Sequence, residues 1–389
     1  MKINEQLVKY EAVLILRKAT GWEAETIANA VRNWLGIEIS PNTVRNWIYY
    51  NKTPRLISPL IKSLFYKDAY ELALRLKEEN PSWGYYKIRG EIKRKLRIWI
   101  PLTTIYRWIA GKSHPNMVPL NIVPELGYVV GALLSDCTTK GEVILRVGDK
   151  DFAEEFAKAL KEVAGKRYKV RIDESYFVVR LRGSALRYIV RSGLWKVIAY
   201  LYPREFLQGL FDGDGGVGVV ARNNIFIVSI SLTNSNREVL AFTKQLLEEK
   251  FGIRCTLRLH RRRGENVKIL GIEYTLKRDC WELRIWRQED VFKFYEQVGF
   301  RIKRKQRKIE DGVTIQRTYK TNRERVKAWL KKYVKKNGKW IPRPPPLFIS
   351  LTLFSLVLLS SHYLLGLALT PSTPQFVLVH SPSLSLTHT

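Results

Sequence analysis

The chain contains few of the side chains that hold transition metals or form disulfides. Its three cysteines, Cys137, Cys255 and Cys280, lie far apart, and no CxxC pair occurs. Neither a zinc knuckle nor a disulfide framework is indicated, and the chain suits a reducing compartment. Only two histidines, His114 and His260, precede residue 350. We therefore expect that carboxylates, rather than imidazoles, hold any catalytic metal.

Acidic residues are scarce relative to basic ones. The 389 residues include 36 Asp and Glu against 67 Lys and Arg, a formal net charge of +31. This excess indicates a polyanionic partner, and nucleic acid is the leading candidate. A thermophilic surface is the alternative, but glutamate normally balances the basic residues there. The first 25 residues are charged and polar and do not resemble a signal peptide, so we expect a cytoplasmic, nucleoid-associated protein.

Charge is absent from the end of the chain, where no Asp, Glu, Lys or Arg follows Arg343 over 46 residues. Residues 347–369 form an uncharged apolar run behind a basic segment, which meets the length and charge criteria for a membrane span. The competing interpretation is that residues 341–389 are an extraneous tail, because their composition shares nothing with the preceding sequence. We favour the tail, and membrane association through residues 347–369 stays open.

The first 118 residues contain a weak internal repeat. Residues 43–48 (TVRNWI) match residues 104–109 (TIYRWI) at a spacing of 61 positions. Each copy follows a segment with helical apolar spacing, at residues 24–34 and 86–96, and then a proline that begins a second helix, the later one at 103–109. This order predicts two all-α helix-turn-helix units, at residues 1–56 and 57–118.

The second helix of such a unit enters the major groove of DNA. Arg45 and Arg107 lie between the apolar positions of these helices and are predicted to contact DNA. Trp47 and Trp108 repeat at an apolar position, so we expect both in the core. Two amphipathic helices joined by a short turn also occur in many bundles, and the motif alone does not exclude that interpretation.

Two similar nonapeptides lie in the middle of the chain, at residues 129–137 (VVGALLSDC) and 207–215 (LQGLFDGDG). Each has two small residues four positions apart, which lets two such helices approach backbone to backbone. Asp136 and Asp214 would then lie side by side at carboxyl helix ends, where the helix dipole and mutual repulsion disfavour negative charge. A divalent cation would compensate, and Mg²⁺ (or Mn²⁺) suits carboxylate and water oxygens.

The paired nonapeptides resemble the LAGLIDADG motifs of homing endonucleases, in the form where one chain carries both. Their aspartates are 78 positions apart, which leaves room for the rest of one αββαββα unit. The resemblance covers roughly residues 122–310. It implies an α+β fold in which two pseudo-symmetric repeats, at 119–202 and 203–340, form a DNA-binding saddle in a monomer.

The sequence patterns support strands and helices in this order. In the first unit we predict a strand at 143–147, a helix at 151–163, paired strands at 169–181 and a helix at 185–200. In the second unit we predict a hairpin at 217–232, a helix at 238–251, long strands at 255–286 and a helix at 289–298.

The resemblance implies that Asp136 and Asp214 bind divalent metal and activate water, each for one DNA strand. It also implies basic or amide side chains around the metals. By position these are Lys150, Asn234 and Lys303, with Lys305 as the alternative to Lys303. Metal ions at such a site lower the pKa of the attacking water and stabilise the leaving oxygen.

Two neighbouring residues are interpreted differently. Asp212 has Leu134 as its counterpart in the first repeat, so we expect a solvated helix-end residue without a catalytic role. Cys137 stands where the second repeat has Gly215. If the chain there adopts the left-handed conformation common at helix ends, a side chain costs about 1–2 kcal/mol, and the first site is impaired.

Strand alternation predicts the DNA-contacting surface. Arg254, Thr256, Arg258 and His260 would project to one side of their strand, and residues 261–264 (RRRG) would form a hairpin tip. A saddle of antiparallel strands along the major groove would use such a face and would bind less tightly as salt increases. The full predicted set in the saddle is Arg180, Arg182, Arg254, Arg258, Arg261, Arg262, Arg263 and Arg284.

The sequence therefore predicts a site-specific double-strand DNA homing endonuclease that hydrolyses phosphodiester bonds. By resemblance its target would be the insertion site of an intron or intein, and no protein partner is indicated. The alternatives are an RNA-splicing maturase that binds intron RNA and a non-catalytic DNA-binding regulator. The two intact aspartates argue against both alternatives. The two helix-turn-helix units favour DNA over RNA, because the major groove of A-form RNA is too narrow for a helix.

Overall fold

The computed structural model describes residues 4–344 except 140, 270–271 and 337. The chain divides into two units, residues 1–330 and 331–389. The described part of the second unit contains one hairpin, β11 (Tyr333–Lys336) and β12 (Lys339–Pro342). The apolar run at 347–369 lies outside the described residues. Within the described ranges, no helix has both the length and the apolar character that crossing a membrane requires.

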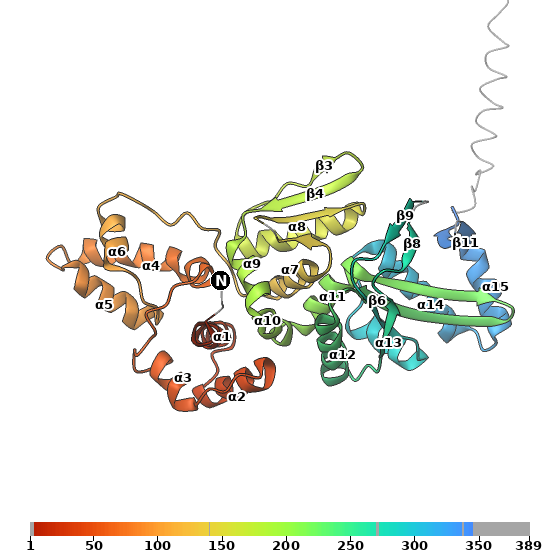
Figure 1. Ribbon diagram of the computed structural model, residues 1–389, viewed down its shortest axis with the longest axis horizontal. Coiled ribbons are helices and arrows are strands. Elements are labelled where there is room, and N and C mark those ends of the chain that lie inside the picture. Colours follow the sequence, from red (N-terminus) through yellow and green to blue (C-terminus); the bar gives the residue numbers. More distant parts are fainter. Residues whose placement is uncertain (1–3, 140, 270–271, 337, 345–389) are drawn as a thin grey trace, which may run out of the picture. The chain divides into compact units, whose positions relative to one another are not determined.

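The first 110 residues fold into two three-helix units, as predicted, with one additional helix at the start of each (Figure 1). In each unit the second and third helices are the predicted helix-turn-helix pair, and the first helix packs against them. The helices are α1 (Glu5–Thr20), α2 (Ala24–Leu35), α3 (Pro41–Ile48), α4 (Pro59–Glu79), α5 (Tyr85–Leu96) and α6 (Leu102–Ile109).

The same aromatic pair anchors both units. Trp47 and Trp108 are buried, which confirms them as core residues. The ring of Tyr10 on α1 meets Trp47 edge-on at 5.3 Å, and Tyr66 on α4 meets Trp108 edge-on at 5.4 Å. The internal repeat is therefore structural as well as sequential, because equivalent helices contribute equivalent rings.

Two αββαββα repeats follow, as predicted. The first contains α7 (Pro124–Ser135), β1 (Cys137–Thr138), β2 (Val143–Val147), α8 (Lys150–Ala164), β3 (Arg171–Asp173), β4 (Tyr176–Leu181), α9 (Ser184–Ser192) and α10 (Trp195–Leu201). The second contains α11 (Pro203–Asp214), β5 (Gly215–Arg222), β6 (Ile225–Asn234), α12 (Arg237–Phe251), β7 (Thr256–Arg261), β8 (Asn266–Ile269), β9 (Ile272–Thr275), β10 (Cys280–Ile285) and α13 (Gln288–Gln297). Helices α7 and α11 lie side by side between the two sheets (Figure 1).

Each repeat has one antiparallel four-stranded sheet. The strand orders are β1-β2-β4-β3 and β5-β6-β10-β7. Helix α8 packs on one face of the first sheet, and α12, α13 and α14 (Lys303–Thr318) pack on one face of the second. The apolar residues of the strands point toward these helices, and Leu145, Ile230 and Leu283 are fully buried. Helix α15 (Asn322–Lys332) follows α14.

The structure differs from the sequence prediction at two elements. The single helix predicted at 185–200 is wrong, because the chain breaks into α9 and α10 at Gly193, whose φ of 79° is left-handed. The long strands predicted at 255–286 are interrupted, since β8 and β9 form a separate two-stranded hairpin between β7 and β10. The repeats are also unequal, because β1 has two residues and β5 has eight.

Candidate active site and nucleic-acid interface

The helices α7 and α11 are in backbone contact, as their small residues predicted. A Cβ atom added at Gly131 would lie 2.2 Å from the carbonyl oxygen of Phe206. One added at Gly209 would lie 2.1 Å from the carbonyl oxygen of Tyr128. Only glycine fits at both positions, because neither obstacle is a side chain that can move aside.

This close approach brings Asp136 and Asp214 together. Asp136 is the C-cap residue of α7, and Asp214 is the last residue of α11. Burial, and then the charge of Asp136, raise the pKa of Asp214 to about 7. Desolvation by the packed helix ends also raises the pKa of Asp136, although that residue is exposed on its other side. The two carboxylates therefore share one partly desolvated site with unbalanced negative charge.

Asn234, a predicted site residue, lies at this site. Its side-chain amide donates to Oδ2 of Asp214 at 2.5 Å and to the carbonyl oxygen of Leu134 at 3.2 Å. The amide thus joins the end of α11 to the end of α7, and it opposes the rise in the pKa of Asp214. The equivalent position in the first repeat, also the last residue of its second strand, is the apolar Val147. The two halves of the site are unequal for this reason.

The structure brings Lys305, rather than Lys303, to the site. The buried ammonium of Lys305 donates to the carbonyl oxygens of Phe211, at 3.0 Å, Asp212 and Gly213, at 3.3 Å. These are the last carbonyls of α11, where a cation opposes the helix dipole. Burial lowers the pKa of Lys305 to about 8, while Asp212 and Asp136 act in the opposite direction.

The other two predicted lysines stay on the surface. Lys303 is exposed at the start of α14. Lys150 is the first residue of α8, and its ammonium lies 3.3 Å from the carboxylate of Glu154 in an exposed ion pair. In the described parts of the chain, neither has a hydrogen bond or ion pair with Asp136 or Asp214. Of these predicted side chains, the structure places Asn234 and Lys305 at the ends of the motif helices, and Lys303 and Lys150 on the surface.

Asp212 is a buried structural residue, so the expectation of a solvated helix end is wrong. Its side chain is 2% exposed. It accepts hydrogen bonds from the hydroxyl of Tyr128 at 2.9 Å and from the backbone N–H groups of Arg301 at 3.2 Å and Ile302 at 3.4 Å. Asp212 therefore ties α11 to α7 and to the start of α14, and burial raises its pKa to about 6. Its carboxylate is engaged in these structural hydrogen bonds, and we do not count it with the pair Asp136 and Asp214.

The strain expected at Cys137 is absent. Helix α7 ends at Asp136 with φ −104° and ψ 0°, and Cys137 begins β1. Gly215 has φ −92° and ψ 162°, which is ordinary extended backbone. A side chain at Gly215 is excluded for another reason, because a Cβ there would lie 2.5 Å from the carbonyl oxygen of Phe211. Left-handed geometry therefore gives no reason to expect an impaired first site.

Oxygen donors dominate this site. The described residues contain no group of three or more His, Cys, Asp and Glu side chains that could hold a metal ion. Asp136 and Asp214 are the two carboxylates that meet at the ends of α7 and α11, and the buried cation of Lys305 does not prevent the rise in their pKa values. This donor set fits a hard cation that keeps several waters and takes further ligands from phosphate.

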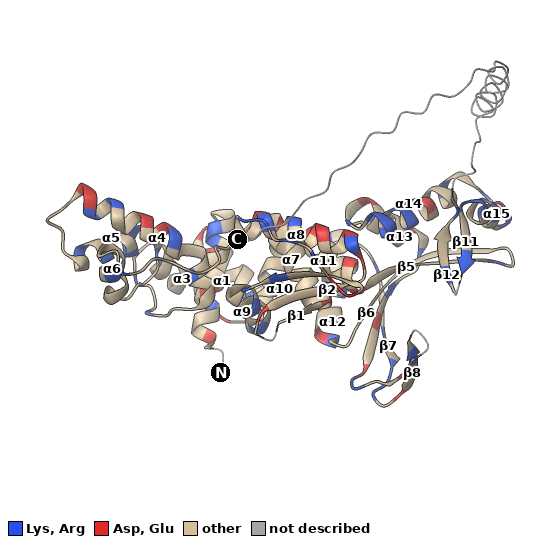
Figure 2. Ribbon diagram, turned by 90° about the horizontal axis from the view of Figure 1, so that it is seen from above, with Lys and Arg blue, Asp and Glu red and all other residues tan. Residues whose placement is uncertain are grey.

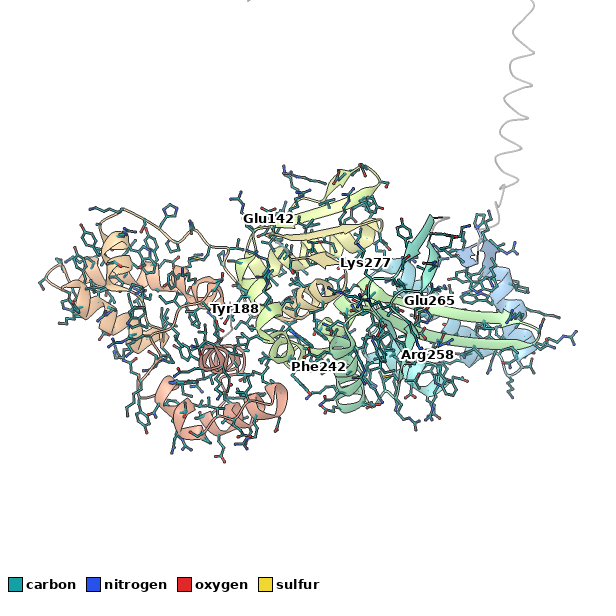
Figure 3. The ribbon with its side chains drawn as sticks, viewed as in Figure 1. Glu142, Tyr188, Phe242, Arg258, Glu265 and Lys277 are labelled. Carbon is teal, nitrogen blue, oxygen red and sulfur yellow. The ribbon has the colours of Figure 1, made fainter. Side chains whose placement is uncertain are left out.

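The face of the second sheet opposite its helices is polar, as strand alternation predicted. Thr256, Arg258 and His260 on β7 are exposed. Across the sheet Arg258 pairs with Glu282 of β10, and their nearest side-chain atoms are 2.6 Å apart. Arg258 is labelled in Figure 3. Arg284 is half-buried on the same face, 3.4 Å from the hydroxyl of Ser229.

The remaining arginines of the second repeat lie at the edges of this sheet. Arg254 precedes β7 and lies 3.7 Å from Asp290 of α13, so its charge is engaged away from the open face. Arg261 ends β7, and Arg262 and Arg263 lie in the connection to β8, with Gly264 at φ 84°. The prediction of a hairpin tip here is wrong, because β7 pairs with β10 and β8 pairs with β9. Figure 2 shows the basic residues along β7 and β8.

The first sheet presents a smaller basic face. Arg180 on β4 is exposed, and Arg182, just beyond it, lies 3.5 Å from Glu142. Arg146 and Arg171 are exposed on the same face as Arg180, as their register shows, and were not predicted. Period-two alternation within residues 143–147 and 169–181 was the signal that could have identified them. In the helix-turn-helix units Arg45 and Arg107 are exposed on α3 and α6, as expected.

Comparison with known families agrees with this architecture. Residues 202–299, from the start of α11 to the end of α13, match the family model of the LAGLIDADG-like domain. The second repeat is a LAGLIDADG-like domain. The match includes Asp214 and Asn234, and the first repeat lies outside it.

Two curated relatives of this chain are uncharacterized proteins of Methanocaldococcus jannaschii. One is 28% identical over 253 residues, which cover 60% of this chain and 89% of the relative. The other is 27% identical over 159 residues, which cover 36% of this chain and 59% of the relative.

Among solved structures, the homing endonuclease I-DmoI in complex with DNA and Ca is similar at 15% identity, with a TM-score of 0.34, over 46% of this chain and 90% of that one. Full-length DUF199/WhiA from Thermatoga maritima is similar at 13% identity, with a TM-score of 0.34, over 62% of this chain and 69% of that one.

Proposed function

We propose that the chain is a site-specific endonuclease that hydrolyses phosphodiester bonds in both strands of duplex DNA. The observation that carries the proposal is the pairing of Asp136 and Asp214 between two sheets that each present a polar, basic face. A basic concave surface holds the phosphates of a duplex, and carboxylates at its centre are placed to act on them.

The surrounding residues of the chain position these carboxylates. Asn234 fixes the orientation of Asp214, and Lys305 holds the last turn of α11. Asp212 anchors that turn to the start of α14. A bound Mg²⁺ or Mn²⁺ would supply an activated water and neutralise charge on the phosphate. Asp136 and Asp214 would hold it, and both must be ionised to do so.

The two helix-turn-helix units extend the predicted contact with DNA. Arg45 and Arg107 are exposed on the third helix of each unit, where base edges are read in such folds. Because the two repeats differ in sequence, a monomer can recognise an asymmetric target. We propose that this target is the insertion site of an intron.

A cleavage assay on supercoiled plasmid DNA carrying a library of candidate sites, with Mg²⁺ or Mn²⁺, tests the proposal. The wild type should linearise the target plasmid. Asp136→Asn and Asp214→Asn should each give nicked circles, and the double variant should bind without cutting. Asp151→Asn, on the helix-covered side of the first sheet, is the matched control and should cut like the wild type. The assay belongs above pH 7, because the pKa of Asp214 is raised to about 7.

A non-catalytic DNA-binding regulator is the second candidate. The observation that favours it is that side chains of the chain already interact with the carboxylate of Asp214. Asn234 donates a hydrogen bond to it, and the charge of Lys305 lowers its pKa. Specific DNA binding without cleavage by any divalent ion above pH 7 would favour the regulator. Cleavage that depends on both aspartates would exclude it.

A further inference from the structure

A groove lies where the second helix-turn-helix unit meets the first repeat. Its volume is about 690 Å³, within the range of ligand sites. The walls come from the start of α4, the linker at 116–118, the loop before β2, the segment after α8, and the junction of β4 with α9. Arg180 and Arg182 are the lining residues that also belong to the DNA-contacting set described above, and the rest of the groove has no role assigned so far.

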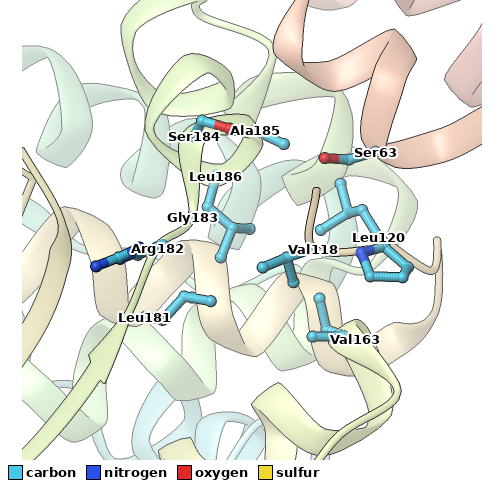
Figure 4. Close-up of a pocket in the computed structure, with 12 residues that line it drawn as sticks. Ser63, Val118, Leu120, Val163, Leu181, Arg182, Gly183, Ser184, Ala185 and Leu186 are labelled. Carbon is cyan, nitrogen blue, oxygen red and sulfur yellow. The ribbon is translucent and has the colours of Figure 1, made fainter. Parts of the chain in front are cut away.

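The linker at 116–118, which lines the groove, is held in place by backbone hydrogen bonds that lie just beyond it in the chain. The N–H of Leu120 donates to the carbonyl oxygen of Ser63 at 3.0 Å, and the N–H of Asn121 donates to that of Val163 at 2.8 Å. A small apolar cavity of about 10 Å³ adjoins the groove and shares Val118 and Leu181 with it. Figure 4 shows this cavity, which Leu120 also helps to line. The linker is thus packed against the first repeat, and the groove is a fixed feature of the fold.

The lining of the groove is strongly basic. Its single acidic side chain, Glu142, lies 3.5 Å from Arg182. The other cations that line it have no ion pair with any described residue. They are Lys62, Lys166, Arg180 and Arg187. A cluster of one charge sign around a concavity concentrates its field and attracts an anion.

Two buried polar atoms in the same groove lack partners. The hydroxyl of Tyr168 and Nε of Arg187 are buried without a hydrogen-bond partner among the described residues. Helix α9 begins beside them at Gly183 and Ser184, and no side chain caps its first N–H groups. Unpartnered donors of this kind, together with a helix N-terminus, suit the oxygens of phosphate.

We propose that this groove binds the sugar-phosphate backbone of duplex DNA between the first sheet and the second helix-turn-helix unit. The inference rests on the proposed function. Arg180 belongs both to the groove and to the open face of β4, and Lys62 belongs to α4, so the groove joins the two predicted DNA-binding surfaces. It contributes affinity and register rather than base recognition.

The test compares two triple variants in binding to a long mixed-sequence DNA duplex over a range of salt concentrations. Lys62→Gln, Lys166→Gln and Arg182→Gln remove three groove charges. Lys158→Gln, Lys161→Gln and Lys244→Gln remove three charges from exposed lysines on α8 and α12, which cover the opposite sheet faces. The groove variant should reduce the slope of log Kd against log salt by about 2–3 and weaken binding about 10- to 100-fold at low salt, while the control variant should change neither.

The variant Tyr168→Phe tests the contribution of the Tyr168 hydroxyl to DNA binding without a change in net charge or a loss of stability. It should leave the melting temperature unchanged or higher, because an unpartnered hydroxyl is removed, and it should weaken DNA binding without changing the salt slope.

Equal slopes for the two triple variants, with intact wild-type binding, would overturn this proposal alone. So would a groove variant that loses affinity for inorganic phosphate but keeps the wild-type salt slope with DNA. A wild type that binds no DNA would instead overturn the proposed function.

Discussion

The side-chain amide of Asn234 bridges the two motif helices, with Oδ2 of Asp214 at 2.5 Å and the carbonyl oxygen of Leu134 at 3.2 Å. No equivalent bridge exists on the other side among the described residues, because Val147 occupies the matching position and no side chain there donates a hydrogen bond to the carboxylate of Asp136. The two repeats therefore give similar folds but unequal carboxylate environments. The inequality comes from this amide and not from strain at Cys137.

Asn234→Val should reproduce the environment of the first repeat in the second. Loss of the amide donor raises the pKa of Asp214 further, so cleavage of its strand should need a higher pH. At pH 7 the rate should fall about 10- to 100-fold, while DNA affinity stays the same. Strand-specific cleavage rates measured against pH will show the shift, and an unchanged pH profile would mean that Asn234 has only a packing role.

Lys305→Met should destabilise the fold, because three carbonyl oxygens at the end of α11 lose their cationic donor. The loss should be about 1–3 kcal/mol in the free energy of unfolding, partly offset by removal of a buried charge. Lys303→Met, at an exposed position two residues earlier, is the matched control and should change stability by less than about 0.5 kcal/mol. Urea unfolding of both variants distinguishes the two lysines, and similar losses would contradict the assignment.

Gly131→Ala and Gly209→Ala should separate α7 from α11. Each added methyl would lie about 2 Å from a backbone carbonyl oxygen of the other helix, so we expect a loss of about 3 kcal/mol or more. Gly90→Ala in α5 has no atom within 4 Å of the added methyl and should stabilise by about 0.5–1 kcal/mol. Thermal unfolding of the three variants measures the contrast. Mild effects at both motif glycines would show that the helices can separate without cost.

Glu11→Gln should change how stability depends on pH. Glu11 is buried between α1, α4 and α9, where it accepts hydrogen bonds from the hydroxyls of Ser58 and Tyr188. Burial raises its pKa from 4.5 to about 7. Ionising it therefore costs stability as pH rises from about 4.5 to about 7, and the full cost applies above that range.

The Glu11→Gln variant should be about 1–3 kcal/mol more stable than the wild type at pH 8 and equal to it near pH 4. Melting temperatures of both proteins across this pH range provide the measurement. A constant difference at every pH would show that Glu11 does not titrate in the folded chain.

Much of the architecture could be predicted because it depends on local pattern. Apolar spacing with a period of 3.6 placed α2, α5 and α12, and period-two alternation placed β2 and β7. The matched small residues and terminal aspartates of the two nonapeptides required α7 and α11 to pair closely. Asp136 and Asp214 could be identified for the same reason.

Only the tertiary structure decided which other side chains join those aspartates. Lys303 and Lys305 differ by two positions, yet the turn of α14 buries one and exposes the other. Asp212 looked solvated, but the hydroxyl of Tyr128 and the start of α14 enclose it, which the sequence around Asp212 could not indicate. The sequence by itself determined the paired helices and their carboxylates. Contacts with residues that lie 20 to 94 positions away along the chain determined the orientation of those carboxylates, their charge and the difference between them, because burial and hydrogen bonding depend on distant parts of the chain.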